Sequence, residues 1–161
     1  MSRFLRVSLV LLLVAALLCG CSQKQKEKHI NCNDLYLILP FDFSDFSEEG
    51  AKEGLAFNYA DTQIGVCGMF ENKETLQAFV PDMDALTYAQ VFAETNGLTD
   101  VPQTVDGIPT FTYAVGGYTY LCGVFESEEN FWVVQAYCQE KDFDANREQM
   151  WKYISSVDVY S

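Results

Sequence analysis

Cysteine and histidine are the residue types in this chain with the widest range of chemistry, and its 161 residues include six cysteines and one histidine. His29 lies in a lysine-rich stretch near the N-terminus, so a catalytic triad or a Cys–His pair would have to recruit it from a linker. No two cysteines have the Cys-x-x-Cys spacing typical of zinc and thioredoxin-type sites. The sequence therefore argues against nucleophilic catalysis with a histidine base, zinc binding and dithiol redox chemistry.

Two aspartates are candidate metal ligands. Asp82 and Asp84 are separated by one residue, and their carboxylate oxygens suit a calcium ion. Their spacing is not that of an EF-hand loop, and an aspartate just before a helix commonly caps that helix. Capping is the favoured interpretation, so we expect no metal and no cofactor.

Aromatic side chains on the predicted strands are the main candidates for a binding surface. If some of them share a sheet face that no helix covers, these residues form a flat recognition surface. The alternative, and the commoner role of aromatic residues on strands, is to fill the core. The candidates are Tyr113, Tyr118, Tyr120 and Trp132.

The first 20 residues have the three-part order of a secretory signal peptide. Arg3 and Arg6 precede an apolar run from Val7 to Leu18, and small residues follow. The run has 12 residues, whereas a membrane-spanning helix needs ~20. We therefore predict that residues 1–20 are a signal peptide and that the mature protein lies outside the cytoplasm.

The end of this segment, Leu18-Cys19-Gly20-Cys21, resembles the lipobox of bacterial lipoproteins. In that family a diacylglyceryl group is attached to the cysteine thiol, and a peptidase cleaves just before this cysteine. The resemblance implies cleavage between Gly20 and Cys21, with Cys21 carrying palmitate-like acyl chains that hold the protein to the cell membrane. Each buried CH₂ group contributes ~0.8 kcal/mol to such an anchor. Ordinary secretory cleavage beside an incidental cysteine is the alternative.

A polar stretch follows the proposed anchor. Ser22 to His29 has no apolar side chain to bury, so residues 21–32 are predicted to be a flexible tether. Its lysines either attract an anionic membrane, by ~1 kcal/mol each, or only solvate a linker. Residues 33–161 are then a single globular domain, long enough to bury a sizeable core.

The predicted domain is strongly acidic. From residue 30 onward it has five basic and 22 acidic side chains, a net charge of −17. Binding to nucleic acid needs the opposite sign, so this class of partner is excluded. The charge suits a cationic ligand or a basic protein partner, although solubility alone also explains it.

Alternating apolar residues and turn signals predict an α+β fold, with an antiparallel sheet of about six to seven strands covered by helices. Ala60-Asp61-Thr62 and Gly116-Gly117 are predicted hairpin connections. Residues 87–96 are predicted to form a helix that Thr87 caps, and a second helix follows Asp142 or Asp144.

A hairpin between residues 118–126 and 130–138 constrains the cysteines. If Phe125 lies opposite Phe131, Cys122 and Cys138 are four positions apart along the ladder, too far for a disulfide bond.

The cysteines that remain after the anchor are Cys32, Cys67, Cys122 and Cys138. An even number in an exported protein is compatible with disulfides, and if one forms, Cys122 would pair with Cys67 or with Cys32. The alternative is that all four are reduced core residues.

Four segments carry a resemblance to a known fold: Leu35-Tyr-Leu-Ile-Leu-Pro40, the helix from Thr87 to Gly97, Phe131-Trp-Val-Val-Gln-Ala-Tyr-Cys138 and Trp151-Lys-Tyr-Ile-Ser-Ser-Val157. With these segments, the order of elements resembles the PsbP-like α/β/α sandwich, a superfamily that includes an extrinsic subunit of the photosynthetic oxygen-evolving complex. It is also similar to small lipoproteins of Gram-positive anaerobes. The resemblance implies a binding or accessory subunit and not an enzyme.

The sequence thus favours a membrane-anchored surface lipoprotein that acts as a non-catalytic binding module. One alternative is a carboxylate-dependent envelope hydrolase, which would need two buried acids with raised pKa values. The other is a domain stabilised by Ca²⁺.

Overall fold

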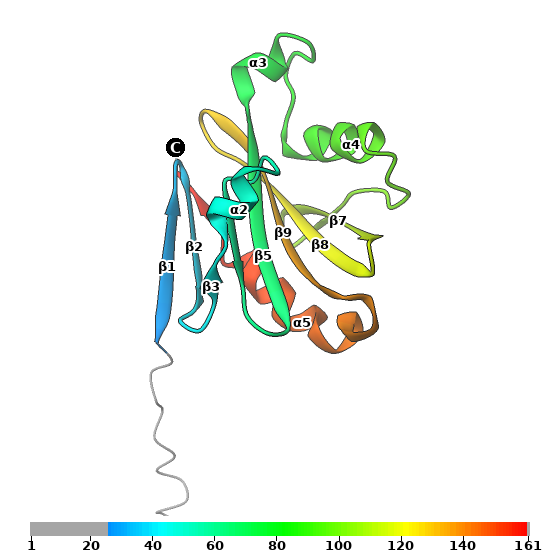
Figure 1. The fold of residues 1–161 in the computed structure, drawn as a ribbon. Coiled ribbons are helices and arrows are strands. Elements are labelled where there is room, and N and C mark those ends of the chain that lie inside the picture. The colour runs from blue at the N-terminus through cyan, green and yellow to red at the C-terminus, as the bar shows by residue number, and fades with distance from the viewer. Residues whose placement is uncertain (1–25, 161) are drawn as a thin grey trace, which may run out of the picture.

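The computed structural model describes residues 26–160, so the predicted signal peptide, Gly20 and Cys21 lie outside the described residues. Most of the strands and helices are labelled in Figure 1. Their order along the chain is β1 (Glu27–Cys32), β2 (Leu35–Pro40), β3 (Ser44–Asp45), α2 (Ser47–Ala51), β4 (Phe57–Ala60), β5 (Ile64–Asn72), α3 (Lys73–Gln77), α4 (Ala85–Thr95), β6 (Gln103–Val105), β7 (Ile108–Val115), β8 (Tyr118–Glu126), β9 (Asn130–Gln139), α5 (Phe143–Ser155) and β10 (Asp158–Val159). Within this part of the chain, no helix combines the length and apolar content needed to cross a bilayer.

A seven-stranded antiparallel sheet forms the centre of the fold, in the order β3-β4-β5-β9-β8-β7-β6. Strand β9 lies in the middle, hydrogen-bonded to β5 on one side and β8 on the other. The predicted α+β class with an antiparallel sheet and covering helices is confirmed. The predicted hairpin at Gly116-Gly117 also forms, and both glycines have positive φ (62° and 82°), as a type I′ turn requires.

Side chains of the central strands alternate between two cores. Even-numbered residues of β9, such as Trp132 and Val134, pack in a cluster with β2 and α5. Odd-numbered residues, such as Phe131 and Val133, pack against α4. The large sheet is therefore the middle layer, with α5 and the small sheet on one face and α4 on the other.

The chain begins to fold earlier than the sequence predicted. Residues 27–32, assigned to the flexible tether, form β1, which pairs along its whole length with β2 in a three-stranded sheet with β10. The prediction failed because an edge strand needs few apolar side chains: its backbone pairs with β2, and Ile30 alone is fully buried (5% exposed). The folded domain therefore starts at about Glu27 and not at residue 33.

Asp34, in the turn between β1 and β2, ties the small sheet to the large one. The indole N–H of Trp132 donates to its Oδ1 (2.7 Å), and the amide of Asn130 donates to its Oδ2 (2.9 Å). The hydroxyl of Ser127 donates to the same Oδ2. Burial raises the pKa of Asp34, but these donors outweigh burial and the net pKa lies below 3.8.

The predicted hairpin between β8 and β9 forms with its register shifted by one residue. Phe125 lies opposite Trp132, where Phe131 was expected. The cause is the turn: the Ser127 hydroxyl accepts from the Asn130 N–H (2.9 Å), and the backbones of these two residues also bond (2.9 Å). This closes a loop of two residues where three were predicted.

Helix α4 begins two residues before the prediction. Asp84 occupies the N-cap position, and its Oδ1 accepts from the Thr87 N–H (2.8 Å). Thr87 is therefore inside the first turn and does not cap the helix. Asp142 precedes α5, but its side chain makes no capping hydrogen bond.

We predict that Asp34→Ala lowers the free energy of unfolding by about 3 kcal/mol, because it leaves the Trp132 indole and the Asn130 amide without their acceptor. Urea unfolding at pH 7 measures the effect. The control is Asp42→Ala, at an exposed loop position. Because the folded-state pKa of Asp34 is lowered, its contribution is complete above about pH 4 and is lost as the pH falls through the folded-state pKa. If the difference in free energy of unfolding between wild type and Asp34→Ala were unchanged at low pH, the stabilising role of the Asp34 carboxylate would be contradicted.

Candidate functional site

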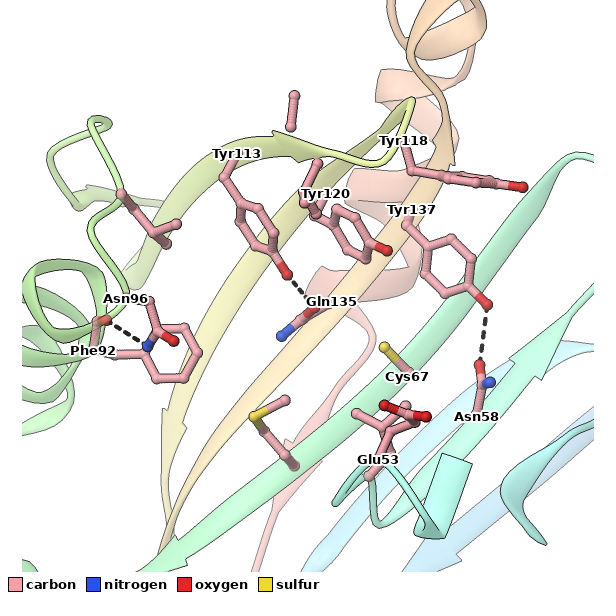
Figure 2. A pocket seen from close by; sticks show the side chains of 15 residues that line it. Glu53, Asn58, Cys67, Phe92, Asn96, Tyr113, Tyr118, Tyr120, Gln135 and Tyr137 are labelled. Carbon is pink, nitrogen blue, oxygen red and sulfur yellow. Dashed lines mark hydrogen bonds between the residues drawn. The ribbon is translucent and has the colours of Figure 1, made fainter. Parts of the chain in front are cut away.

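Helix α4 covers only part of its face of the sheet, and a groove of about 760 Å³ lies on the uncovered part. The groove is lined by residues of β4, β5, β7, β8 and β9, by the end of α4 and by the loop after α2 (Figure 2). Its lining residues are Glu53, Leu55, Asn58, Cys67, Met69, Phe92, Asn96, Leu98, Tyr113, Ala114, Val115, Tyr118, Tyr120, Gln135 and Tyr137.

A row of tyrosines runs across three neighbouring strands at one side of the groove. Tyr113 lies opposite Tyr120 in the β7–β8 ladder, and Tyr120 lies opposite Tyr137 in the β8–β9 ladder. The rings of Tyr113 and Tyr120 are stacked with centroids 4.7 Å apart, and those of Tyr120 and Tyr137 are 5.4 Å apart. Tyr118 meets Tyr137 edge to face at 6.1 Å. Figure 2 shows this row with the hydroxyl groups of Tyr113 and Tyr137 directed at amide side chains.

The next strand provides space for the last ring of the row. Gly65 lies opposite Tyr137 in the β5–β9 ladder, and a Cβ atom at Gly65 would lie only 2.0 Å from Cζ of Tyr137. The ring therefore lies over the glycine backbone, and its hydroxyl donates to Oδ1 of Asn58 on β4 (3.1 Å). The missing side chain of Gly65 thus sets the position of Tyr137.

The floor of the groove is polar but uncharged. Gln135 is almost fully buried (3% exposed), and its Oε1 accepts from the Tyr113 hydroxyl (2.9 Å). Burial raises the pKa of the Cys67 thiol to about 12, and burial followed by the nearby Cys67 and Tyr120 raises the pKa of Tyr137 to about 12. Burial also raises the pKa of Tyr113. These groups are therefore neutral at pH 7, and Cys67 is a poor nucleophile.

Two short elements form the rim. At the end of α4, the Asn96 amide donates to the backbone carbonyl oxygen of Phe92 (2.8 Å), and the side chains of both residues line the groove (Figure 2). On the opposite side, the turn after α2 brings Glu53 to the groove. Glu53 is the only charged residue in the lining.

The structure brings three of the four predicted aromatic residues together. Tyr113, Tyr118 and Tyr120 all line the groove. Trp132 does not: it is fully buried (0% exposed) in the opposite core, because even-numbered residues of β9 face α5. Trp132 therefore has the core role that the sequence analysis gave as the alternative to a binding surface.

Sequence reasoning missed several residues of the groove, among them Tyr137, Gln135 and Glu53. Gln135 carried a usable signal, since it is the only strongly polar side chain between Phe131 and Cys138. A polar residue inside an apolar central strand marks a face that is not fully covered.

The structure does not support a disulfide bond between Cys67 and Cys122, a pair that the sequence left possible. Both residues lie opposite Gln135, one on each side of β9, and both thiols are free. Two strand spacings separate their backbones by about 10 Å, beyond the ~7 Å limit for a disulfide. Cys32 packs with the opposite core, so it does not offer Cys122 a partner either.

The two aspartates considered as calcium ligands have separate local roles. Asp84 caps α4, and hydrogen bonds from the backbone and side chain of Thr87 lower the pKa of its carboxyl group. Asp82 occupies a left-handed turn position (φ 58°). Among residues 26–160, no group of three or more His, Cys, Asp or Glu side chains has a geometry that could hold a metal ion.

Comparison with solved structures identifies the architecture. The solution structure of the cyanobacterial PsbP protein CyanoP from Synechocystis sp. PCC 6803 superposes with a TM-score of 0.62, over 88% of this chain and 97% of that chain. This chain has the PsbP fold. The two sequences are 14% identical, so the similarity to PsbP concerns the fold alone. No family model and no curated protein sequence matches the chain.

We predict that Gly65→Ala displaces the Tyr137 ring and destabilises the protein by about 1–3 kcal/mol, as overpacking does. The matched control is Gly68→Ala in the same strand, where a Cβ atom would meet Phe57 in the other core. NMR shifts of the Tyr137 ring and urea unfolding measure the two effects. A Tyr137 ring with wild-type shifts in Gly65→Ala would contradict the proposed contact.

We also predict that Cys32, which is partly exposed, reacts with iodoacetamide in the native protein, whereas Cys67 and Cys122 react only after unfolding in urea. Peptide mass spectrometry before and after urea distinguishes the sites. Recovery of a Cys67–Cys122 disulfide-linked peptide from unreduced protein would show that the strand order around β9 is wrong.

Proposed function

We propose that this chain is a lipoprotein anchored to the outer face of the cell membrane through Cys21, and that its PsbP-fold domain is a non-catalytic binding module. The groove carries the binding part of the proposal. The anchor rests on the N-terminal sequence. The two parts are independent, so each needs its own support and its own test.

The anchor is supported by four coincident features of the N-terminus: the basic start, the short apolar run, the small residue Gly20 and the cysteine after it. The early start of the folded domain adds a geometric consequence. Glu27, the first residue of β1, follows Cys21 by six positions, and a chain of that length reaches at most about 20 Å. In the proposed lipoprotein the domain therefore lies close to the membrane surface.

The binding role is supported by the size and lining of the groove. Its volume of about 760 Å³ lies within the ~300–1,000 Å³ typical of small-molecule sites. Tyrosine rings and a few amide groups line it, which is the mixture that binding sites use to combine contact area with orientation.

The protonation states in the groove favour binding over catalysis. A carboxylate-dependent hydrolase uses two acids with different pKa values on either side of the substrate, and the groove is lined by a single carboxylate, that of Glu53. Burial raises the pKa values of the Cys67 thiol and of the Tyr113 and Tyr137 phenols, which keeps these groups neutral and removes them as bases or nucleophiles at pH 7.

We predict that Cys21→Ser abolishes incorporation of radiolabelled palmitate and leaves the protein at its precursor size, because the thiol is the acylated atom and the peptidase cleaves just before this cysteine. The matched control is Cys19→Ala, two residues earlier, which should keep both the label and the mature size. Labelling in intact cells followed by gel electrophoresis measures both. An unlabelled wild-type protein, or a Cys21→Ser protein that keeps the label, would contradict the anchor.

A further inference from the structure

We infer that the groove binds a small molecule with an alkylated ammonium group, which lies beside the tyrosine row and pairs with the Glu53 carboxylate. The inference rests on the proposed binding function and specifies its ligand class. Three observations carry it: the charge of the lining, the aromatic rings and the amide group at the floor.

The charge of the lining has one sign. Glu53 is its only charged residue, and no lysine, arginine or histidine lines the groove. Within residues 26–160 the ion pairs are Lys73–Glu126 and Lys152–Glu148, so Glu53 has no cationic partner there. The domain around the groove is also acidic. An anionic ligand would meet a carboxylate and no compensating charge, whereas a cation is favoured both near the groove and at long range.

The aromatic rings are the second observation that favours a cationic ligand. Tyr113, Tyr118, Tyr120 and Tyr137 all line the groove. The faces of Tyr113, Tyr120 and Tyr137 are partly covered, because these rings pack on one another and Tyr137 lies over Gly65. Tyr118 is 42% exposed and is the ring of the row most open to a ligand.

A cation within about 6 Å of a ring face is attracted by its electron density. Elsewhere in the protein such contacts already form: Lys28 Nζ lies 5.5 Å from the ring centre of Tyr59, and Lys73 Nζ lies 5.7 Å from that of Phe131. Alkylated ammonium groups suit this geometry best, because they are weakly hydrated and have apolar surface to bury.

The floor offers a group that would orient the rest of the ligand. Gln135 is buried, and its one hydrogen bond among the described residues occupies Oε1. Its Nε2 group therefore remains available to donate to an oxygen atom on the ligand. A short amino alcohol, with its ammonium group beside the tyrosine row and its hydroxyl at Gln135, fits this arrangement.

The test uses choline and its uncharged isostere 3,3-dimethylbutan-1-ol as probes, measured by calorimetry on the full lipid-anchored chain in an uncharged detergent. The two molecules have the same shape and hydroxyl group and differ in charge. We expect choline to bind at least tenfold more tightly than the neutral alcohol, because only the cation gains from the rings and the carboxylate.

Two variants with matched controls locate the binding. Glu53→Gln is expected to weaken choline binding about threefold, which is the range for one exposed charge pair. Its control is Glu48→Gln, at an exposed position on α2 outside the groove lining. Tyr118→Ala is expected to weaken binding severalfold, and its control is Tyr160→Ala, which is similarly exposed (44% against 42%) and lies outside the groove.

Three results would overturn the inference. One is no binding of choline at millimolar concentration by a folded protein. Another is equal affinity for choline and the neutral alcohol, which would show an apolar groove for neutral ligands. The last is choline binding that Glu53→Gln and Tyr118→Ala leave unchanged. None of these results would affect the palmitate test, so failure of the cation site is distinguishable from failure of the membrane anchor.

Discussion

The register of β9 between β5 and β8 is the constraint on which the rest of the structure depends. Because side chains alternate along a strand, this register decides which residues enter the core under α5 and which face α4. A shift of one residue would bring Trp132 to the groove face and bury Tyr137. The turn at Ser127 and Asn130 fixes the register at one end of the strand, and the contact between Tyr137 and Gly65 fixes it at the other.

The two faces of the sheet are covered to different extents, and this difference creates the candidate site. On one face, α5 and the small sheet cover the core. A hydrogen bond from the Trp132 indole to Asp34 joins the small sheet to the large one. On the other face, α4 has only 11 residues and ends at Asn96 and Gly97, before it reaches the tyrosine row. The uncovered tyrosines then depend on one another and on two amides, Asn58 and Gln135, for their positions.

Most of the fold could be predicted from the sequence because strong local signals mark it. The glycine pair at 116–117 and the apolar strands predicted the hairpins and the antiparallel sheet. The register of the last hairpin could not be predicted, because the side-chain hydrogen bonds of Ser127 decide the loop length and leave no mark in the apolar pattern. β1 was missed for a related reason: its pairing with β2 uses backbone groups, which every sequence provides.

The candidate site was predicted only in part. Tyr113, Tyr118 and Tyr120 were chosen for their type, but their shared face depends on the register of neighbouring strands. Trp132 and Tyr137 are both aromatic residues in one nearly continuous apolar run, so alternation could not show which of them faces outward. Glu53 follows a five-residue helix far away in the sequence, and only the tertiary fold brings it to the tyrosines.

The most direct test of the account is an NMR measurement of intermolecular nuclear Overhauser effects between the methyl protons of bound choline and the protein. The account predicts contacts from these methyl groups to the ring protons of Tyr118, Tyr120 and Tyr137. Contacts to the rings of other aromatic residues alone, or no intermolecular contacts at saturating choline, would contradict it.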